Sequence, residues 1–508
     1  MQHDSRTIRR ALVSVYHKEP VTELVRCLHR HGAEIYSTGG TLAHIRALGL
    51  PARAVEELTG YPSILGGRVK TLHPAVFGGI LSRREQSDDK QELLRYRIPE
   101  FDLVAVDLYP FEETLQNGAG EAEAIEQIDI GGISLIRAAA KNFRDVLVVP
   151  SSRMFQEAVQ LIDAGNGRTA LADRRRFAAA AFRVSSGYDR AIGGFMLGAE
   201  AGEFHRQAAP MMSLRYGENP HQQGRFYGPL QELFEQLNGK ALSYNNLLDI
   251  DAALQLVRGQ QQACFAVIKH TNVCGMAVRD DLLTAWKDAL AGDPVSAFGG
   301  IIVTNRPVGE EVARSLHELF FEVLIAPGFE DRALEVLRQK KNRILLRLKP
   351  VDLPADTFRS ALNGVLWQEA DLAMAGPERW THPTKREAGP EETADLLFAN
   401  HVVKHLKSNA IALVKNRQLL GAGMGQTSRV DALRQAIGRA RANGHDLRGS
   451  VMASDAFFPF PDCVEIAHQA GITAVIQPGG SVRDGESVAF CDQAGMAMAM
   501  TGLRHFKH

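Results

Sequence analysis

Residues 11–37, ALVSVYHKEPVTELVRCLHRHGAEIYS, decide the fold of the first part of the chain. The run ALVSVY (11–16) predicts a strand, VTELVRCLHRHG (21–32) has the spacing of an amphipathic helix that ends in glycine, and AEIYS (33–37) predicts a second strand. Strands that alternate with helices at this spacing indicate a parallel sheet covered by helices.

The same alternation continues beyond this unit. TLAHIRALG (41–49) predicts another helix, and LVAVDLYPF (103–111) and DVLVVP (145–150) predict further strands. We expect a first domain at 1–200, a linker at 201–213 where the pattern lapses, and a larger α/β region at 214–508. Strands predicted in the larger region are CFAVIKH (264–270), GGIIVTN (299–305), AIALVKN (410–416) and ITAVIQPGG (472–480). Two strand–turn–polar units, near 265–305 and 410–480, hint at an internal duplication.

The composition is that of a soluble globular protein. Hydrophobic residues make up 45% and charged residues 23% of 508 residues, and the formal net charge is -1. Without an excess of either charge, no global field attracts nucleic acid or a membrane surface. We find neither a signal-peptide pattern nor an apolar run of the about 18–20 residues that a membrane span needs. The five cysteines are scattered and form no CxxC, so we expect no disulfide framework, no metal site and a reducing cytoplasm.

Two glycine-containing loops of the first domain are candidates for anion binding. STGGT (37–41) lies between a strand and a helix, where free N–H groups favour an anion, although a plain tight turn also explains it. In GGRVKTLHP (66–74), Arg68 and Lys70 project to one face if the chain is extended, and a solvated basic loop is the alternative. Tyr109, Asp129 and Lys141 supply further titratable groups in the same domain.

The larger region contains VIKHTNVCGMAV (267–278), a hydrophobic run that stops on Lys269 and His270. One interpretation is a strand that leaves the core, so that both side chains meet water. The other is a site to which the strand delivers both groups. Because neighbours in a strand point to opposite faces, the second interpretation requires the backbone to leave the pleat, and we expect a turn at 272–275.

From SVYHK (14–18) to RHFKH (504–508), the chain resembles the family that joins phosphoribosylaminoimidazolecarboxamide (AICAR) formyltransferase to IMP cyclohydrolase. Its motifs follow the family order, among them SLRYGENPHQ (213–222), LSYNNLLD (242–249) and ASDAFFPFPD (453–462). The resemblance implies a methylglyoxal-synthase-like N-terminal domain and a C-terminal transformylase built from a duplicated cytidine-deaminase-like unit without zinc. It implies formyl transfer from 10-formyltetrahydrofolate to AICAR, followed by ring closure of formyl-AICAR to IMP. Members are homodimers that share residues between transformylase sites.

The resemblance also implies roles for individual residues. His270 is the base or proton shuttle of formyl transfer, and Lys269 is the partner that stabilises charge or protonates the leaving folate nitrogen. Lys70, Tyr109, Asp129 and Lys141 serve cyclisation. The nucleotide of the first domain is held by Ser14, Lys18, Ser37, Thr38, Gly39, Gly40, Thr41, Arg68 and Thr71. The nucleotide of the second is held by Arg215, Tyr216, Asn246, Phe298, Gly299, Glu322, Asn409, Arg429 and Arg504. The folate pocket consists of Val430, Phe457, Phe458, Pro459, Phe460 and Asp462.

The chain departs from the family pattern at Tyr16, His17, Asp107 and Val273. The carboxylate of Asp107 would weaken anion binding unless a basic residue compensates for it. An alternative function is therefore a transformylase whose N-terminal domain only binds nucleotide. A non-catalytic folate or nucleotide sensor is a second alternative, but such a protein has no need of both Lys269 and His270.

Overall fold

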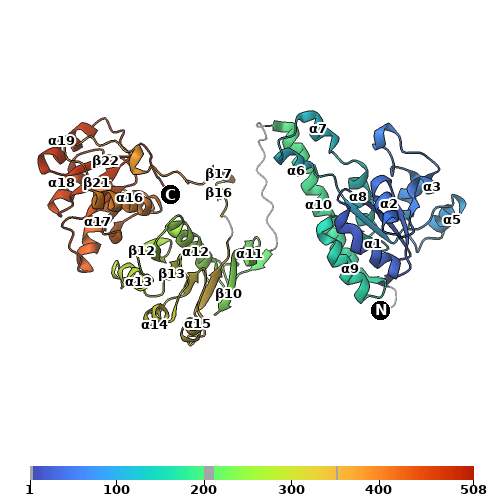
Figure 1. Ribbon diagram of the computed structural model, residues 1–508, viewed down its shortest axis with the longest axis horizontal. Helices are drawn as coiled ribbons and strands as arrows, with labels where there is room; N and C mark the ends of the chain where they lie inside the picture. The colour runs from blue at the N-terminus through green and yellow to red at the C-terminus, as the bar shows by residue number, and fades with distance from the viewer. Residues whose placement is uncertain (1–3, 199–210, 351–352) are drawn as a thin grey trace. The chain divides into compact units, whose positions relative to one another are not determined.

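The computed structural model describes residues 4–198, 211–350 and 353–508 (Figure 1). The chain divides into two compact units, Met1–Glu203 and Phe204–His508. Most of the predicted linker at 201–213 lies outside the described residues. Its last three residues form strand β8 (Met211–Ser213), which pairs with β9 (Arg225–Tyr227).

The first unit is the predicted parallel sheet with helices around it (Figure 1). Its strands, in spatial order and all parallel, are β4 (Arg53–Ala54), β3 (Glu34–Ser37), β2 (Arg10–Val15), β5 (Leu103–Asp107) and β6 (Leu147–Val149). The helices are α1 (Thr22–Arg30), α2 (Gly39–Ala47), α3 (Val55–Thr59), α4 (Pro74–Leu81), α5 (Ser87–Arg95), α6 (Phe111–Gln116), α7 (Glu121–Glu126), α8 (Gly131–Lys141), α9 (Phe155–Ala164) and α10 (Leu171–Leu197). A short antiparallel pair is formed by β1 (Ser5–Thr7) and β7 (Arg168–Ala170).

The carboxyl ends of the parallel strands place the candidate residues of this unit at one edge. Register pairs Val13 with Ser37 and Val15 with Asp107, so β2, β3 and β5 end side by side. The loops after these strands carry STGGT and the residues around Tyr109. In open parallel sheets, ligands bind outside this edge.

The second unit contains an 11-stranded sheet made of two equivalent five-stranded halves and one additional edge strand, which confirms the predicted duplication. Each half has a helix, an antiparallel hairpin, a second helix, and three parallel strands joined by helices. The first half consists of α12 (Tyr244–Val257), β11 (Ala263–Lys269), β12 (Asn272–Arg279), α13 (Leu282–Ala291), β13 (Ile301–Thr304), α14 (Glu310–Glu318), β14 (Val323–Ala326), α15 (Asp331–Leu337) and β15 (Ile344–Leu348). The second consists of α16 (Pro390–Lys404), β18 (Ile411–Lys415), β19 (Gln418–Gly423), α17 (Arg429–Ala442), β20 (Val451–Ser454), α18 (Asp462–Gln469), β21 (Ala474–Gln477), α19 (Asp484–Ala494) and β22 (Ala497–Met500).

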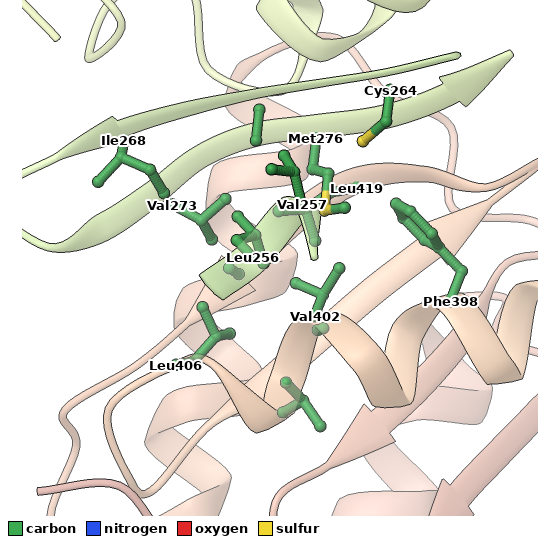
Figure 2. Packing of buried hydrophobic residues seen from close by; sticks show 14 of the residues in the cluster. Leu256, Val257, Cys264, Ile268, Val273, Met276, Phe398, Val402, Leu406 and Leu419 are labelled. Atoms are coloured by element: carbon green, nitrogen blue, oxygen red, sulfur yellow. The ribbon is translucent and has the colours of Figure 1, made fainter. Parts of the chain in front are cut away.

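The halves meet where β12 pairs with β19, and one hydrophobic cluster joins them. In Figure 2, Phe398 and Val402 of α16 approach Met276 of β12 and Val257 of α12, so helices of both halves pack on the same core. The remaining elements are α11 (Leu230–Leu233), β10 (Phe234–Asn238), which pairs with β15, and the hairpin of β16 (Asp356–Ala361) and β17 (Gly364–Glu369).

The predicted turn at 272–275 is wrong. Asn272 begins β12, and the turn is formed by His270 and Thr271, whose φ angles are 54° and 59°. Gly275 serves a different purpose, since a Cβ there would lie 1.8 Å from the carbonyl oxygen of Ala289. The glycine therefore lets α13 lie directly against β12, and it was mistaken for a turn residue.

All five cysteines are free and buried. Burial raises the pKa of the Cys264, Cys274, Cys463 and Cys491 thiols to about 12. A search of the described residues for a helix long and apolar enough to cross a membrane finds none.

Candidate active sites

The start of α2 is the centre of an anion site in the first unit. Thr38 is extended before the helix, and Gly39 (φ 45°) and Gly40 form its first turn. The Nζ of Lys70 lies 3.7 Å from the position of a Cβ on Gly39, and the Cε of Lys18 lies 3.3 Å from the corresponding position on Gly40. Two ammonium groups thus flank free helical N–H groups, an arrangement that suits a phosphate.

The charge of Lys18 is constrained by its surroundings. Its Nζ donates to the carbonyl oxygens of Val15 and, at 2.7 Å, Tyr16. Burial lowers the pKa of Lys18, the charge of Asp107 opposes this shift, and the charge of Lys70 adds to it. A bound anion would relieve the repulsion between the two lysines.

Two of the predicted phosphate-binding hydroxyls are occupied by the sheet. Ser37 Oγ donates to the carbonyl oxygen of Val13 at 2.7 Å, and Thr41 Oγ1 donates to that of Val15 at 3.0 Å. These side chains fix the loop geometry, and both residues are buried. The N–H of Thr41 already donates to the carbonyl oxygen of Thr38 at 3.1 Å. Ser14 and Thr38 lie closer to the edge, with their hydroxyl oxygens 3.5 Å apart.

Lys70, Tyr109 and Asp129 come together at this edge. Gly132 N–H donates to Asp129 Oδ1 at 2.6 Å, and the backbone N–H of Tyr109 and the charge of Lys70 also favour the carboxylate. Burial outweighs these contributions and raises the pKa of Asp129. Burial, together with the nearby carboxylate, also raises the pKa of Tyr109. The site therefore holds one cation, one phenol and one carboxyl that is poised to carry a proton.

The other predicted residues of this domain divide into two groups. Thr71 is buried, with Oγ1 3.1 Å from the position of a Cβ on Gly131, and so belongs to the cluster. Arg68 is exposed and forms an ion pair with Glu126. Lys141 is the last residue of α8, whereas Asp129 precedes its first turn. At about 1.5 Å per residue, Gly131 and Lys141 lie roughly 15 Å apart along the helix axis.

Two of the departures from the family pattern are partners. His17 Nδ1 lies 2.7 Å from Asp107 Oδ2, and the backbone N–H of His17 donates to the same oxygen at 3.1 Å. The other carboxylate oxygen accepts from Ser152 N–H at 3.2 Å. Hydrogen bonds from His17 and Ser152 therefore hold the Asp107 carboxylate, which fixes the loop after β2. Tyr16 packs edge-to-face on Tyr109, with ring centroids 5.6 Å apart.

In the second unit, Lys269 and His270 lie at the tip of the β11–β12 hairpin. Lys269 Nζ donates to the carbonyl oxygen of Phe298 at 2.7 Å. The N–H groups of His270 and Thr271 donate to the carboxylate of Asp249 at 3.1 and 2.6 Å. The His270 side chain is exposed and lines a groove of about 1560 Å³, so it meets solvent and is not packed in hydrocarbon.

A second polar group lies on the neighbouring elements of the same half. Asn246 Nδ2 donates to Glu322 Oε2 at 3.2 Å, and Lys240 Nζ donates to Glu322 Oε1 at 3.3 Å. Gly299 has a φ of 77° and donates to the carbonyl oxygen of Phe320 at 2.8 Å, which holds the Phe298 loop beside β14. The Phe298 ring is 58% exposed and packs on the Phe320 ring, with ring centroids 5.0 Å apart.

The second half contributes an arginine cluster to the same edge of the sheet. Ile411 at the start of β18 pairs with Ser454 at the end of β20, next to the end of β19. Arg429 donates to Asn409 Oδ1 at 2.8 Å, Asp455 Oδ1 at 3.0 Å and the carbonyl oxygen of Phe457 at 3.0 Å. Arg429 Nε and Asp455 Oδ2 are buried without a hydrogen-bond partner, so this cluster retains capacity for a polar ligand.

The predicted folate residues do not share one environment. Phe458 is fully buried in the core of the second half, so its side chain cannot contact a ligand in this structure. Phe457 and Phe460 are 37% and 49% exposed, and Asp462 begins α18. Exposed Pro459 and half-exposed Val430 would complete a wall made of the outer residues. Arg215 stacks on Tyr216, and Arg504 stacks on Phe506. The N–H of His505, next to Arg504, donates to the carbonyl oxygen of Asp455 at 3.0 Å.

Sequence reasoning missed the carboxylates of Asp249 and Asp455. Both lie within motifs that stand out in the sequence, LSYNNLLD and ASDAFFPFPD. The residues beside each carboxylate are helical or aromatic and do not indicate which group it binds. One group of possible metal ligands exists among the described residues, Cys27, His31 and Asp163. Arg30 already binds that carboxylate, and the pKa of the thiol, raised to about 12, disfavours metal binding.

A parallel α/β unit with a lysine-flanked helix start, followed by a duplicated unit with a Lys–His tip and a buried arginine, defines a two-site enzyme for anionic ligands. The family model described as "AICARFT/IMPCHase bienzyme" matches residues 139–439, and that of the "MGS-like domain" matches 21–134. The chain belongs to the AICARFT/IMPCHase bienzyme family. Its activities are those of the family, AICAR formyl transfer and the closure of formyl-AICAR to IMP, the last two steps of IMP synthesis.

Curated relatives match over nearly the whole chain. "Bifunctional purine biosynthesis protein PurH" of Bacteroides thetaiotaomicron is 55% identical over 99% of this chain and 100% of its own length. The proteins of the same description from Chloroflexus aurantiacus and Corynebacterium glutamicum (strain R) are 48% and 45% identical. They cover 98% and 100% of this chain and 98% and 100% of their own lengths.

Proposed function

We propose that His270 and Lys269 carry formyl transfer, with 10-formyltetrahydrofolate as the donor. The amine of AICAR is a poor nucleophile, because its lone pair is delocalised into the ring and the carboxamide. His270 accepts the amine proton as nitrogen bonds to the formyl carbon, and the Lys269 ammonium stabilises the negative charge on the formyl oxygen. Cleavage of the bond to the folate nitrogen, which takes up a proton, then releases formyl-AICAR.

The observation that carries this assignment is the hairpin tip, where an exposed imidazole faces a groove and the neighbouring ammonium is held against Phe298. Asn246, Glu322, Gly299, Asn409, Arg429 and the outer residues of the 457–462 loop lie at the same edge. Arg429 suits a phosphate or carbonyl oxygen, since a guanidinium donates several hydrogen bonds in one plane.

Ring closure belongs to the first unit. The carboxamide nitrogen attacks the formyl carbon of the same molecule, and water leaves, so the site needs orientation and charge stabilisation more than a strong nucleophile. Lys70 stabilises the developing oxyanion, and Tyr109 and Asp129 carry protons beside it. Gly39, Gly40 and Lys18 hold the phosphate. The pairing of His17 with Asp107 supports a competent cyclohydrolase over the transformylase-only alternative, because the added carboxylate is bound by His17 and Ser152.

Three further assignments complete the proposal. The enzyme works as a homodimer, which the exposed apolar side chains of the β16–β17 hairpin support, among them Leu366 and Trp367 at 56% and 55% exposure. It works in the cytoplasm, in agreement with five free buried thiols. No metal takes part, and neither nucleic acid nor membrane is a partner.

The test of the proposed function is an assay of the intact chain with AICAR and 10-formyltetrahydrofolate, in which IMP is the expected product. Formyl-AICAR supplied alone isolates the second reaction. Accumulation of formyl-AICAR without IMP would support the transformylase-only alternative, and sedimentation would measure the dimer.

A further inference from the structure

The turn that carries His270 adopts a conformation that side chains normally avoid. His270 and Thr271 both have positive φ, and the left-handed region costs a non-glycine residue about 1–2 kcal/mol. A single carboxylate offsets this cost, because Asp249 on α12 accepts hydrogen bonds from both backbone N–H groups of the turn. The direction of the His270 side chain therefore depends on Asp249.

The second half of the unit repeats this arrangement at the opposite edge of the sheet. Asn416 and Arg417 form the turn of the β18–β19 hairpin with φ angles of 51° and 53°. Their N–H groups donate to Asp395 on α16 at 2.8 and 2.6 Å. Lys415, like Lys269, donates at 2.7 Å to a carbonyl oxygen three residues before the next parallel strand, that of Arg448.

The two tips therefore share a scaffold and differ in both side chains of the turn. Thr271 of the first half corresponds to Arg417 of the second. Where the first half has an imidazole at the first turn position, the second half has the amide of Asn416. The carboxylate that clamps the turn is an ordinary part of the fold in the second half. In the first half the same carboxylate lies next to a group that must gain a proton.

We propose that Asp249 is the positioning residue of formyl transfer, which orients His270 and stabilises the imidazolium that forms when His270 accepts the amine proton. The inference rests on the function proposed for His270. A negative charge next to a general base raises its proton affinity, as carboxylates do for histidine in many sites.

Other charged groups near the groove also contribute to the electrostatic environment of Asp249 and His270. Glu322 lies near enough for its charge to raise the pKa of Asp249, to which burial makes the largest contribution, while the two turn N–H groups lower it. Lys269 precedes His270 in the chain. The remaining charged or titratable groups lining the groove are Glu218, Asp251, Arg258, Asp356, Arg359, Asp371, His401, Lys404, His405, Lys407, Arg417, Lys507 and His508.

The duplicated scaffold provides the matched control. Asp249→Asn and Asp395→Asn each remove one charge and one of two equivalent acceptors from a left-handed turn, so any general effect on folding is matched. We expect Asp249→Asn to lower kcat for formyl transfer about tenfold or more with a smaller change in KM, because a weaker base transfers protons more slowly. The acidic limb of its pH–rate profile should move to lower pH, since His270 then loses its proton more readily. Asp395→Asn should leave kcat and the profile unchanged.

Cyclisation of supplied formyl-AICAR should survive in both variants, which reports on the integrity of the preparation. Equal losses of formyl transfer in the two variants would overturn the proposal, as would a loss in Asp249→Asn with an unmoved acidic limb. Failure of the underlying assignment has a different signature, because then a variant without the His270 imidazole would keep formyl transfer.

Discussion

Replacement of His270 by Asn tests the assignment of the base with little disturbance of the fold. The equivalent position of the second half is Asn416, which adopts a φ of 51° in the same kind of turn. The clamp by Asp249 uses only backbone N–H groups and is retained. The side chain is exposed, so we expect the free energy of unfolding to change by no more than about 0.5 kcal/mol.

The effect on catalysis should be far larger. A general base contributes about 10²–10⁴-fold in rate, which corresponds to about 2.7–5.4 kcal/mol of activation free energy. The assay measures formyl transfer under saturating AICAR and 10-formyltetrahydrofolate, with thermal unfolding and the cyclisation of supplied formyl-AICAR as parallel measurements. Asn416→His, the reverse exchange at the other tip, serves as the control and should change none of them.

Two results would refute the reasoning. A loss of formyl transfer smaller than about tenfold in a normally folded variant would show that His270 is not the base. An equal loss of cyclisation would show that the two reactions do not use separate sites.

Lys70→Ala should have the opposite effect to His270→Asn. The rate of cyclisation should fall about 10²-fold or more, because charge stabilisation is lost, while formyl transfer persists. Intact cyclisation would show that Lys70 takes no part in the mechanism. Asp129→Asn should abolish cyclisation and raise the melting temperature at pH 7. The pKa of Asp129 is raised in the folded chain, so its carboxyl stabilises the fold fully only below its unfolded pKa of about 3.9. This contribution is lost as pH rises. The increase in melting temperature caused by Asn should therefore vanish on acidification. Scanning calorimetry at several pH values measures this gain, and a pH-independent difference would contradict it. His17→Ala should raise KM for formyl-AICAR, because the Asp107 carboxylate then lacks its partner, and Asp107→Asn in the same chain should restore KM. Steady-state kinetics of the double-mutant cycle measures this coupling. Additive effects of the two substitutions would count against the pairing.

Much of the fold follows from local patterns in the sequence. The strands at 11–16, 103–111 and 264–270 are short hydrophobic runs and are confirmed within a few residues as β2, β5 and β11. The duplication was only hinted at, because the topology and the clamped hairpin turns repeat while the two halves share no obvious sequence identity. The turn was misplaced, since Gly275 marks a close approach to α13, which involves residues distant in sequence.

The sequence names candidate site residues, but it does not reveal their contacts. A motif does not show whether a side chain faces a ligand or the protein interior. Ser37, Thr41 and Phe458 were expected at ligands, but the two hydroxyls bond to the sheet and the Phe458 ring is buried in the core. The pairing of His17 with Asp107 joins residues 90 positions apart. Such partners become visible only when parallel strands bring their ends to one edge.

Because every thiol is buried, the reactivity of the cysteines reports local unfolding of the chain. Cys27 is the single cysteine of the first unit, while the other four lie in the second. The protonated, enclosed thiols are shielded from alkylating reagents until the structure around them loosens. The labelling rate of each cysteine would therefore measure the local opening of each unit separately, without any engineered probe.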